Sequence, residues 1–173
     1  MVRGRRKPDW SYTALMPARK RRPNMGDSSA RIKEPPVVFS PWVPWAERNS
    51  IDKVHLPGLY LLAHRDEPPP RIADPLAREV ISIGGVTEGS LMGRWQQFHR
   101  SAFQGKPGHK DGMRYHQIFG DDPQAEHRLY VAAFVPQGLP RELRALFIRY
   151  AMARLLWGSA RRWGAPPVCN AQQ

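Results

Sequence analysis

Gly58-Leu-Tyr-Leu-Leu-Ala-His64 and Val80-Ile-Ser-Ile-Gly84 are the stretches that decide the fold. Both are short apolar runs with aromatic or β-branched residues and turn residues beyond them, which predicts two strands. The turn after the first covers residues 66–70 and holds three consecutive prolines. A third run, Leu129-Tyr-Val-Ala-Ala-Phe134, has the same character. The sequence therefore predicts a small, mostly antiparallel sheet of three strands.

Two helices are predicted beside these strands. Ser90 is a good N-cap for the first helix, and Pro140 begins a second that runs to about Trp163. Helical spacing gives each an apolar face, formed by Leu91, Trp95, Phe98 and Ala102 in the first and by Leu143, Leu146, Phe147, Tyr150 and Trp157 in the second. The order β-β-α-β-α predicts an α/β (α+β) domain, a sheet flanked by helices.

Composition limits the class of protein. A hydrophobic content of 41% in 173 residues is enough for a core and excludes wholesale disorder. The apolar runs are too short for a transmembrane helix, and the N-terminus lacks the apolar region of a secretory signal. The single cysteine, Cys169, excludes an internal disulfide framework and a multi-cysteine metal site. With a net charge of +12, we expect a cytoplasmic protein without membrane contact that handles a polyanion.

The positive charge is concentrated at the N-terminus. Residues 1–33 hold ten basic and two acidic side chains, a net charge of +8 out of +12. We expect residues 1–35 to be a flexible basic arm, 36–55 an extended Pro- and Trp-rich lead-in on the domain surface, and 56–173 the folded domain. The arm would bind phosphate non-specifically through Arg5, Arg6, Lys7, Arg19, Lys20, Arg21 and Arg22. A solvated tail, or translation that starts at Met16 or Met25, is the alternative.

Residues 104–113 are rich in glycine and basic side chains, which predicts a loop. With its neighbours, this loop would form an edge that contacts nucleic-acid phosphates; a solvated surface turn is the alternative. The residues of this edge are Arg100, Lys106, His109, Lys110 and Arg114.

Five segments between about Leu56 and Asn170 resemble, in order, the motifs of the GIY-YIG nuclease superfamily. They are Pro57-Gly-Leu-Tyr60 for the "PGIY" strand, Ile81-Ser-Ile-Gly84 for "YIG", Ser90-Leu-Met-Gly-Arg-Trp95 for the helix with the family's arginine, Ala151-Met-Ala-Arg-Leu-Leu156 for "LExxLI", and Pro166-Pro-Val-Cys-Asn170 for "PxxN". The resemblance implies an enzyme that cleaves phosphodiester bonds, most simply in DNA, with one divalent metal ion, Mg²⁺ or Mn²⁺.

The resemblance also implies roles for single residues. Tyr60 would be a general base or a phenol that orients water, and a nearby cation would have to favour its phenolate. Arg94 would bind the scissile phosphate and stabilise the charge that develops on it. Asn170 would pin the last segment against the sheet or near the phosphate, and Ser82 stands where the second motif has tyrosine. In the plainer interpretation, Tyr60 is an ordinary strand aromatic and Arg94 an ordinary surface residue.

The departures from the family pattern leave cleavage open. Met152 occupies the position of the metal-binding glutamate, and a thioether is a poor ligand for Mg²⁺. Phe98 stands where many members have histidine. Glu88 or Glu126 could approach the site from a loop, whereas Glu142 is about 15 Å from Met152 along the helix. Two hypotheses follow: an active endonuclease, or a catalytically inactive nucleic-acid-binding or assembly protein that retains the fold. A basic subunit of a larger assembly is a third, and the oligomeric state is not predicted.

Overall fold

A computed structural model of the chain describes residues 33–170. One compact unit begins at Pro35. Nearly all of the predicted arm falls outside the described residues, and with it the basic residues expected to bind phosphate there, Arg5, Arg6, Lys7, Arg19, Lys20, Arg21 and Arg22.

A four-stranded antiparallel sheet lies at the centre, with the strand order β1-β4-β2-β3. The strands are β1 (Val43–Pro44), β2 (Gly58–His64), β3 (Val80–Val86) and β4 (Leu129–Phe134). In the register, Tyr60 of β2 pairs with Gly84 of β3 and with Ala133 of β4. The predicted class, α+β with a small antiparallel sheet, is confirmed. The strand count is wrong by one, because β1 is only two residues long and contains a proline, too little for a recognisable strand pattern.

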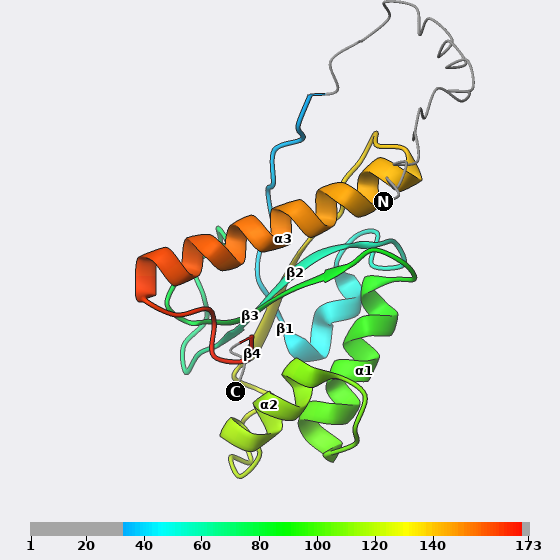
Figure 1. Cartoon of the computed structure of the whole chain (residues 1–173). Helices are drawn as coiled ribbons and strands as arrows, with labels where there is room; N and C mark the ends of the chain where they lie inside the picture. The colour runs from blue at the N-terminus through cyan, green and yellow to red at the C-terminus, as the bar shows by residue number, and fades with distance from the viewer. Residues whose placement is uncertain (1–32, 171–173) are drawn as a thin grey trace, which may run out of the picture. The chain divides into compact units, whose positions relative to one another are not determined.

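Helices cover both faces of this sheet (Figure 1). α1 (Leu91–Gln104) and α2 (Lys110–Phe119) lie on one face, and α3 (Arg141–Trp163) lies on the other. Because side chains alternate along a strand, Tyr60 and Leu62 pack with α1, whereas Leu59 packs with α3. None of the helices within residues 33–170 is long and apolar enough to cross a membrane.

α1 forms as its sequence predicts. The Ser90 hydroxyl accepts a hydrogen bond from the Gly93 N–H at 3.1 Å, and Gly105 ends the helix in a left-handed conformation. The predicted apolar face is buried: Leu91, Trp95, Phe98 and Ala102 are each at most 1% exposed.

The predicted loop is present only between α1 and α2, over residues 105–109; α2 begins at Lys110, so the prediction is wrong for residues 110–113. His109 caps this helix, because its Nδ1 accepts a hydrogen bond from the Gly112 N–H at 3.2 Å. A Cβ atom at Gly112 would lie 2.8 Å from Ser101 Cβ and 2.9 Å from the Phe98 carbonyl oxygen. Gly112 therefore serves the close packing of α2 on α1, and it does not mark a loop.

α3 turns a different face to the sheet than its periodicity predicts. Ile148 and Ala151 are buried, and Leu155 packs with them. Most of the predicted apolar face points to solvent: Leu146, Tyr150 and Trp157 are 58%, 49% and 66% exposed. The prediction is wrong because large apolar side chains occupy the outer face of this helix.

The lead-in contributes to the core. Trp45 begins η1 (Trp45–Ser50), is fully buried, and contacts Trp95 and Phe98 of α1 edge-on. The expectation of an extended segment on the domain surface is therefore wrong for this part of the lead-in.

Candidate functional site

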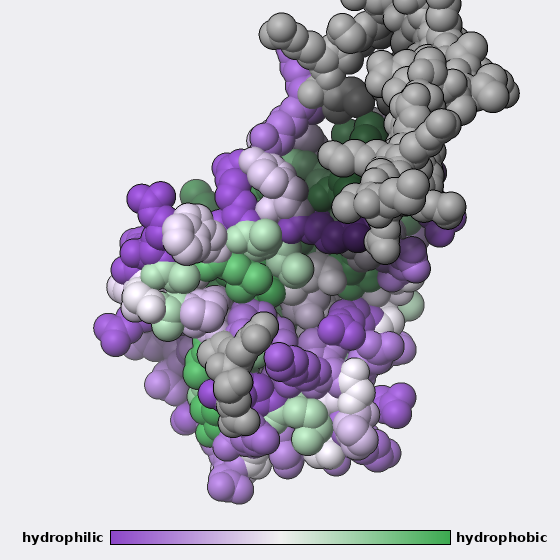
Figure 2. All heavy atoms as spheres, viewed as in Figure 1, coloured by the Kyte–Doolittle hydropathy of each residue, from purple (hydrophilic) through white to green (hydrophobic). Residues whose placement is uncertain are grey.

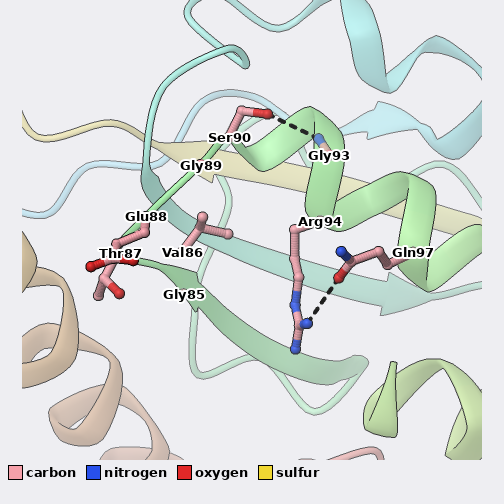
Figure 3. A pocket seen from close by; sticks show the side chains of 9 residues that line it. All are labelled: Gly85, Val86, Thr87, Glu88, Gly89, Ser90, Gly93, Arg94 and Gln97. Carbon is pink, nitrogen blue, oxygen red and sulfur yellow. Dashed lines mark hydrogen bonds between the residues drawn. The ribbon is translucent and has the colours of Figure 1, made fainter. Parts of the chain in front are cut away.

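An open cleft of about 420 Å³ lies between the end of β3 and the start of α1. Its walls are formed by Gly85, Val86, Thr87, Glu88, Gly89, Ser90, Gly93, Arg94 and Gln97. Figure 3 shows Arg94 extending from α1 over the strands, with Gln97 turned toward it. The Arg94 Nη1 atom donates a hydrogen bond to Gln97 Oε1 at 3.2 Å. Arg94 is the one cationic side chain among the described residues that line this cleft.

Tyr60 lies on the face of the sheet that α1 covers, and it packs with residues of that helix. It is 1% exposed, and its ring packs perpendicular to the Trp95 ring system with ring centres 6.3 Å apart. The ring extends over Gly84 of the neighbouring strand, where a Cβ atom would overlap it. Gly84, in the segment that resembles "YIG", therefore leaves space for the ring of Tyr60, in the segment that resembles "PGIY".

His109 contacts the Tyr60 phenol, and its own contacts define the proton position. Because His109 Nδ1 accepts from the Gly112 N–H, the neutral ring carries its proton on Nε2. Nε2 lies 3.3 Å from Tyr60 Oη, so His109 donates this hydrogen bond. Burial, with a smaller contribution from the positive charge of Arg94, lowers the pKa of His109 to about 3. At neutral pH this site therefore contains a neutral imidazole that donates to the phenol oxygen.

The position of His109 corrects the expectation of a phosphate-contacting surface residue. The side chain is 1% exposed, because it caps α2 beneath the packed helices. Of the other residues of that predicted edge, Arg100, Lys106 and Lys110 are exposed, and Arg114 is half-buried.

Asp111 is the carboxylate of this site, and the sequence did not predict it. It lies in the first turn of α2, and its Oδ2 accepts hydrogen bonds from Ser82 Oγ at 2.7 Å and from Asn170 Nδ2 at 3.0 Å. Burial raises the pKa of Asp111; the Ser82 hydrogen bond and the charge of Arg94 act in the opposite direction. Ser82 and Asn170 thus meet on a carboxylate that belongs to neither motif-like segment.

Asn170 holds the end of the described chain against β3, the edge strand of the sheet. Its Oδ1 accepts from the Ile83 N–H at 2.7 Å, and its Nδ2 donates to the Ile83 carbonyl oxygen at 3.2 Å. The Cys169 N–H donates to the Ile81 carbonyl oxygen at 2.8 Å. The last segment therefore hydrogen-bonds the backbone of Ile81 and Ile83 in the edge strand, and it brings the Asn170 amide to Asp111.

Arg94 connects the cleft with the buried groups. Its charge lowers the pKa values of Tyr60, His109 and Asp111. For Tyr60 this effect is outweighed, because burial and then the Asp111 charge raise the phenol pKa well above its ordinary value. The cation expected beside the phenol is present, but Tyr60 remains a neutral phenol at neutral pH.

The other carboxylates considered for this site lie elsewhere. Glu126 is 3.8 Å from His99 Nδ1, and Glu88 lines the cleft at the end away from Arg94 (Figure 3). Glu142 is exposed in the first turn of α3. Met152, at the position of the family's glutamate, packs among apolar residues on the α3 face, and a Cβ atom at Gly85 would lie 3.2 Å from its Sδ.

The described residues contain no group of three or more His, Cys, Asp or Glu side chains that could hold a metal ion. Asp111 is a single carboxylate whose two hydrogen bonds both fall on Oδ2, which leaves Oδ1 for a further ligand. Mg²⁺ commonly binds through one or two carboxylates together with substrate phosphates. One carboxylate is too few ligands to hold a cation by itself. The site therefore fits a cation that is bound jointly by Asp111 and a substrate phosphate better than a cation that is bound by protein side chains alone.

Comparison of the chain with protein-family models, with curated proteins and with solved structures finds no match. The function of the chain is therefore inferred from its own residues and their geometry.

Proposed function

We propose that this chain is a GIY-YIG-like endonuclease that hydrolyses phosphodiester bonds of DNA. One observation carries the proposal: Arg94 lines an open cleft and also acts electrostatically on Tyr60, His109 and Asp111. A phosphate in this cleft would meet a cation whose charge also acts on a phenol and a carboxylate. This combination supports phosphoryl transfer, which depends mainly on positioning and charge stabilisation.

Arg94 is the residue that would bind the scissile phosphate. A guanidinium group donates paired hydrogen bonds to phosphate oxygens, and the bond to Gln97 restricts the orientation of this one. Its charge would also stabilise the additional negative charge that develops on the phosphate during the reaction. Loss of one such donor typically costs about 10²- to 10³-fold in rate.

Tyr60 would orient the attacking water. The Nε2–H group of His109 donates to the phenol oxygen, so the phenol proton can be donated to a second acceptor. The raised pKa keeps this proton on Tyr60 at neutral pH, which suits a hydrogen-bond donor and not a preformed phenolate base. His109 is a positioning residue in this scheme, since it holds the phenol.

Asp111 would hold the divalent cation together with the substrate phosphate. Its Oδ2 is oriented by Ser82 and Asn170, which leaves Oδ1 as the ligand atom. When bound, Mg²⁺ or Mn²⁺ supplies positive charge that stabilises the phosphoryl and leaving oxygens. In this proposal, Asp111 replaces the carboxylate that is absent at Met152.

A plasmid-nicking assay with Mg²⁺ or Mn²⁺ tests this function. We expect the full chain to convert supercoiled plasmid to the nicked form, and Arg94→Ala to be at least about 100-fold slower. Tyr60→Phe should also slow nicking, whereas Arg71→Ala, which removes an exposed arginine of the loop between β2 and β3, should retain the rate. Equal nicking by Arg94→Ala and the unchanged chain would refute the assignment of the cleft.

The second candidate is a nucleic-acid-binding or assembly protein that has this fold and does not cleave. The complete burial of Tyr60 and the apolar packing of Met152 favour it. Plasmid binding without nicking under both metals would support this candidate. Nicking gained by Met152→Glu would then identify a lost metal site, and binding to ribonucleoprotein in preference to DNA would indicate a subunit of a larger assembly.

A further inference from the structure

The outer face of α3 presents large aromatic side chains to solvent. Tyr150 is 49% exposed and Trp157 is 66% exposed, although α3 is packed against the sheet along its other side. The two residues are seven positions apart, about 10.5 Å along the helix axis. Exposed aromatic side chains of this size, gathered on one face, are typical of an interaction surface.

Arginines alternate with these aromatic residues. Arg154 lies between them, donates a hydrogen bond to Tyr150 Oη at 3.3 Å, and has its guanidinium carbon 5.9 Å from the Tyr150 ring centre. Arg161 follows Trp157 by four residues, so that Tyr150, Arg154, Trp157 and Arg161 form one row, which we call the α3 row. At its end, a hollow of about 280 Å³ is lined by Leu76, Gly158, Arg161 and Arg162.

The positive charge of α3 indicates which kind of partner would bind to it. The helix contains six arginines and one glutamate. Pairing with a second copy would bring two rows of arginines together, which their like charges disfavour. Figure 2 shows pale side chains of intermediate hydropathy among purple, hydrophilic ones over the C-terminal half of this helix. The complementary partner is therefore a polyanion.

We propose that the α3 row binds single-stranded nucleic acid. Bases would stack on the Tyr150 and Trp157 rings, and phosphates would pair with arginines of α3 such as Arg161. Aromatic platforms in a basic surface bind single strands in this way. A duplex keeps its base faces stacked within the helix, so it could use only the arginines. This surface is separate from the cleft, because α3 and α1 lie on opposite faces of the sheet (Figure 1). The inference therefore does not depend on cleavage.

Fluorescence anisotropy with the full chain and an oligothymidylate of about 20 nucleotides tests this inference. The Tyr150→Ala/Trp157→Ala variant should bind it roughly 10- to 100-fold more weakly, since each stacked base contributes about 1–3 kcal/mol. An abasic oligonucleotide with the same number of phosphates should bind both proteins equally, because it has no bases to stack. The control is Ile72→Ala, which removes an apolar side chain that is 82% exposed and should change neither affinity.

Three results would overturn the proposal. The first is unchanged oligothymidylate binding by the double variant, and the second is an equal loss for the abasic probe. The third is dimerisation in sedimentation runs that the double variant abolishes, which would show that a second copy covers this face. The experiments separate single-strand binding by the α3 row from cleavage in the Arg94 cleft. The double variant should nick saturating plasmid at the normal rate, and Arg94→Ala should keep its affinity for oligothymidylate.

Discussion

Protonation of His109 is incompatible with the hydrogen bonds that this side chain makes in the folded chain. Nδ1 accepts from the Gly112 N–H and Nε2 donates to Tyr60, so an added proton on Nδ1 would face another N–H group. The pKa of His109 is accordingly lowered from 6.5 to about 3. Between these values the unfolded chain binds a proton that the folded chain does not, so stability falls as the pH falls. Each pH unit is worth about 1.4 kcal/mol, which gives a loss of about 2.6 kcal/mol between about pH 7.5 and 4.5.

Urea unfolding across this pH range, with the unchanged chain and His109→Asn, measures the effect. Asparagine is a good N-cap and does not titrate, so the variant keeps a cap for α2 and loses the ring. The free energy of unfolding should fall more steeply with acid in the unchanged chain, by about 2.6 kcal/mol over the range. His64 and His99, whose pKa values are also lowered, and Asp111, whose raised pKa acts in the opposite sense, are present in both proteins. Parallel pH profiles would refute the assigned tautomer.

Three further predictions concern packing, reactivity and charge. Gly84→Ala should lower the free energy of unfolding by about 1–3 kcal/mol and slow nicking, because its methyl group overlaps the Tyr60 ring; urea unfolding with unchanged stability would contradict this. Cys169 is buried, which raises its thiol pKa to about 12, so iodoacetamide should modify it only in urea, as read by mass spectrometry; rapid modification of the folded chain would refute this. Deletion of residues 1–33 should weaken non-specific DNA binding and flatten its salt dependence, and an unchanged slope in a salt titration would exclude a role for the arm.

The parts of the fold that the sequence predicts are those where local pattern and burial agree. The α1 residues Leu91, Trp95 and Phe98 recur with helical spacing and are all buried, and β2 and β3 form from the apolar runs that predict them. On α3 the same reasoning selects the wrong face, because Tyr150 and Trp157 are large and apolar but exposed. Periodicity identifies an apolar face and cannot distinguish one that packs in the core from one that a partner covers.

The candidate site divides in the same way. Short local segments identify four residues of the site: Tyr60, Ser82, Arg94 and Asn170. Ser82 and Asn170 donate hydrogen bonds to Asp111, and the charge of Arg94 acts on Tyr60. Asp111 could not be identified in this way, because it is 29 residues from Ser82 and 59 from Asn170 in sequence. In addition, Gly105, Gly108 and Gly112 near the start of α2 make this stretch of sequence resemble a loop, so the helix that carries Asp111 was not predicted. One signal was present: a residue capable of N-capping, His109, followed two positions later by an acidic side chain, is typical of a helix start.

Asp111 supplies the carboxylate of a phosphodiester-cleaving site in the proposed function, a claim that Mg²⁺-dependent nicking by Asp111→Asn tests most directly. Asparagine retains an oxygen that can accept from Ser82 and Asn170, and it removes a partly buried charge, so the variant should unfold at no lower urea concentration than the unchanged chain. We predict a fall in nicking of at least about 100-fold with the fold intact. Nicking by Asp111→Asn at the rate of the unchanged chain, or no nicking by either protein, would contradict the claim.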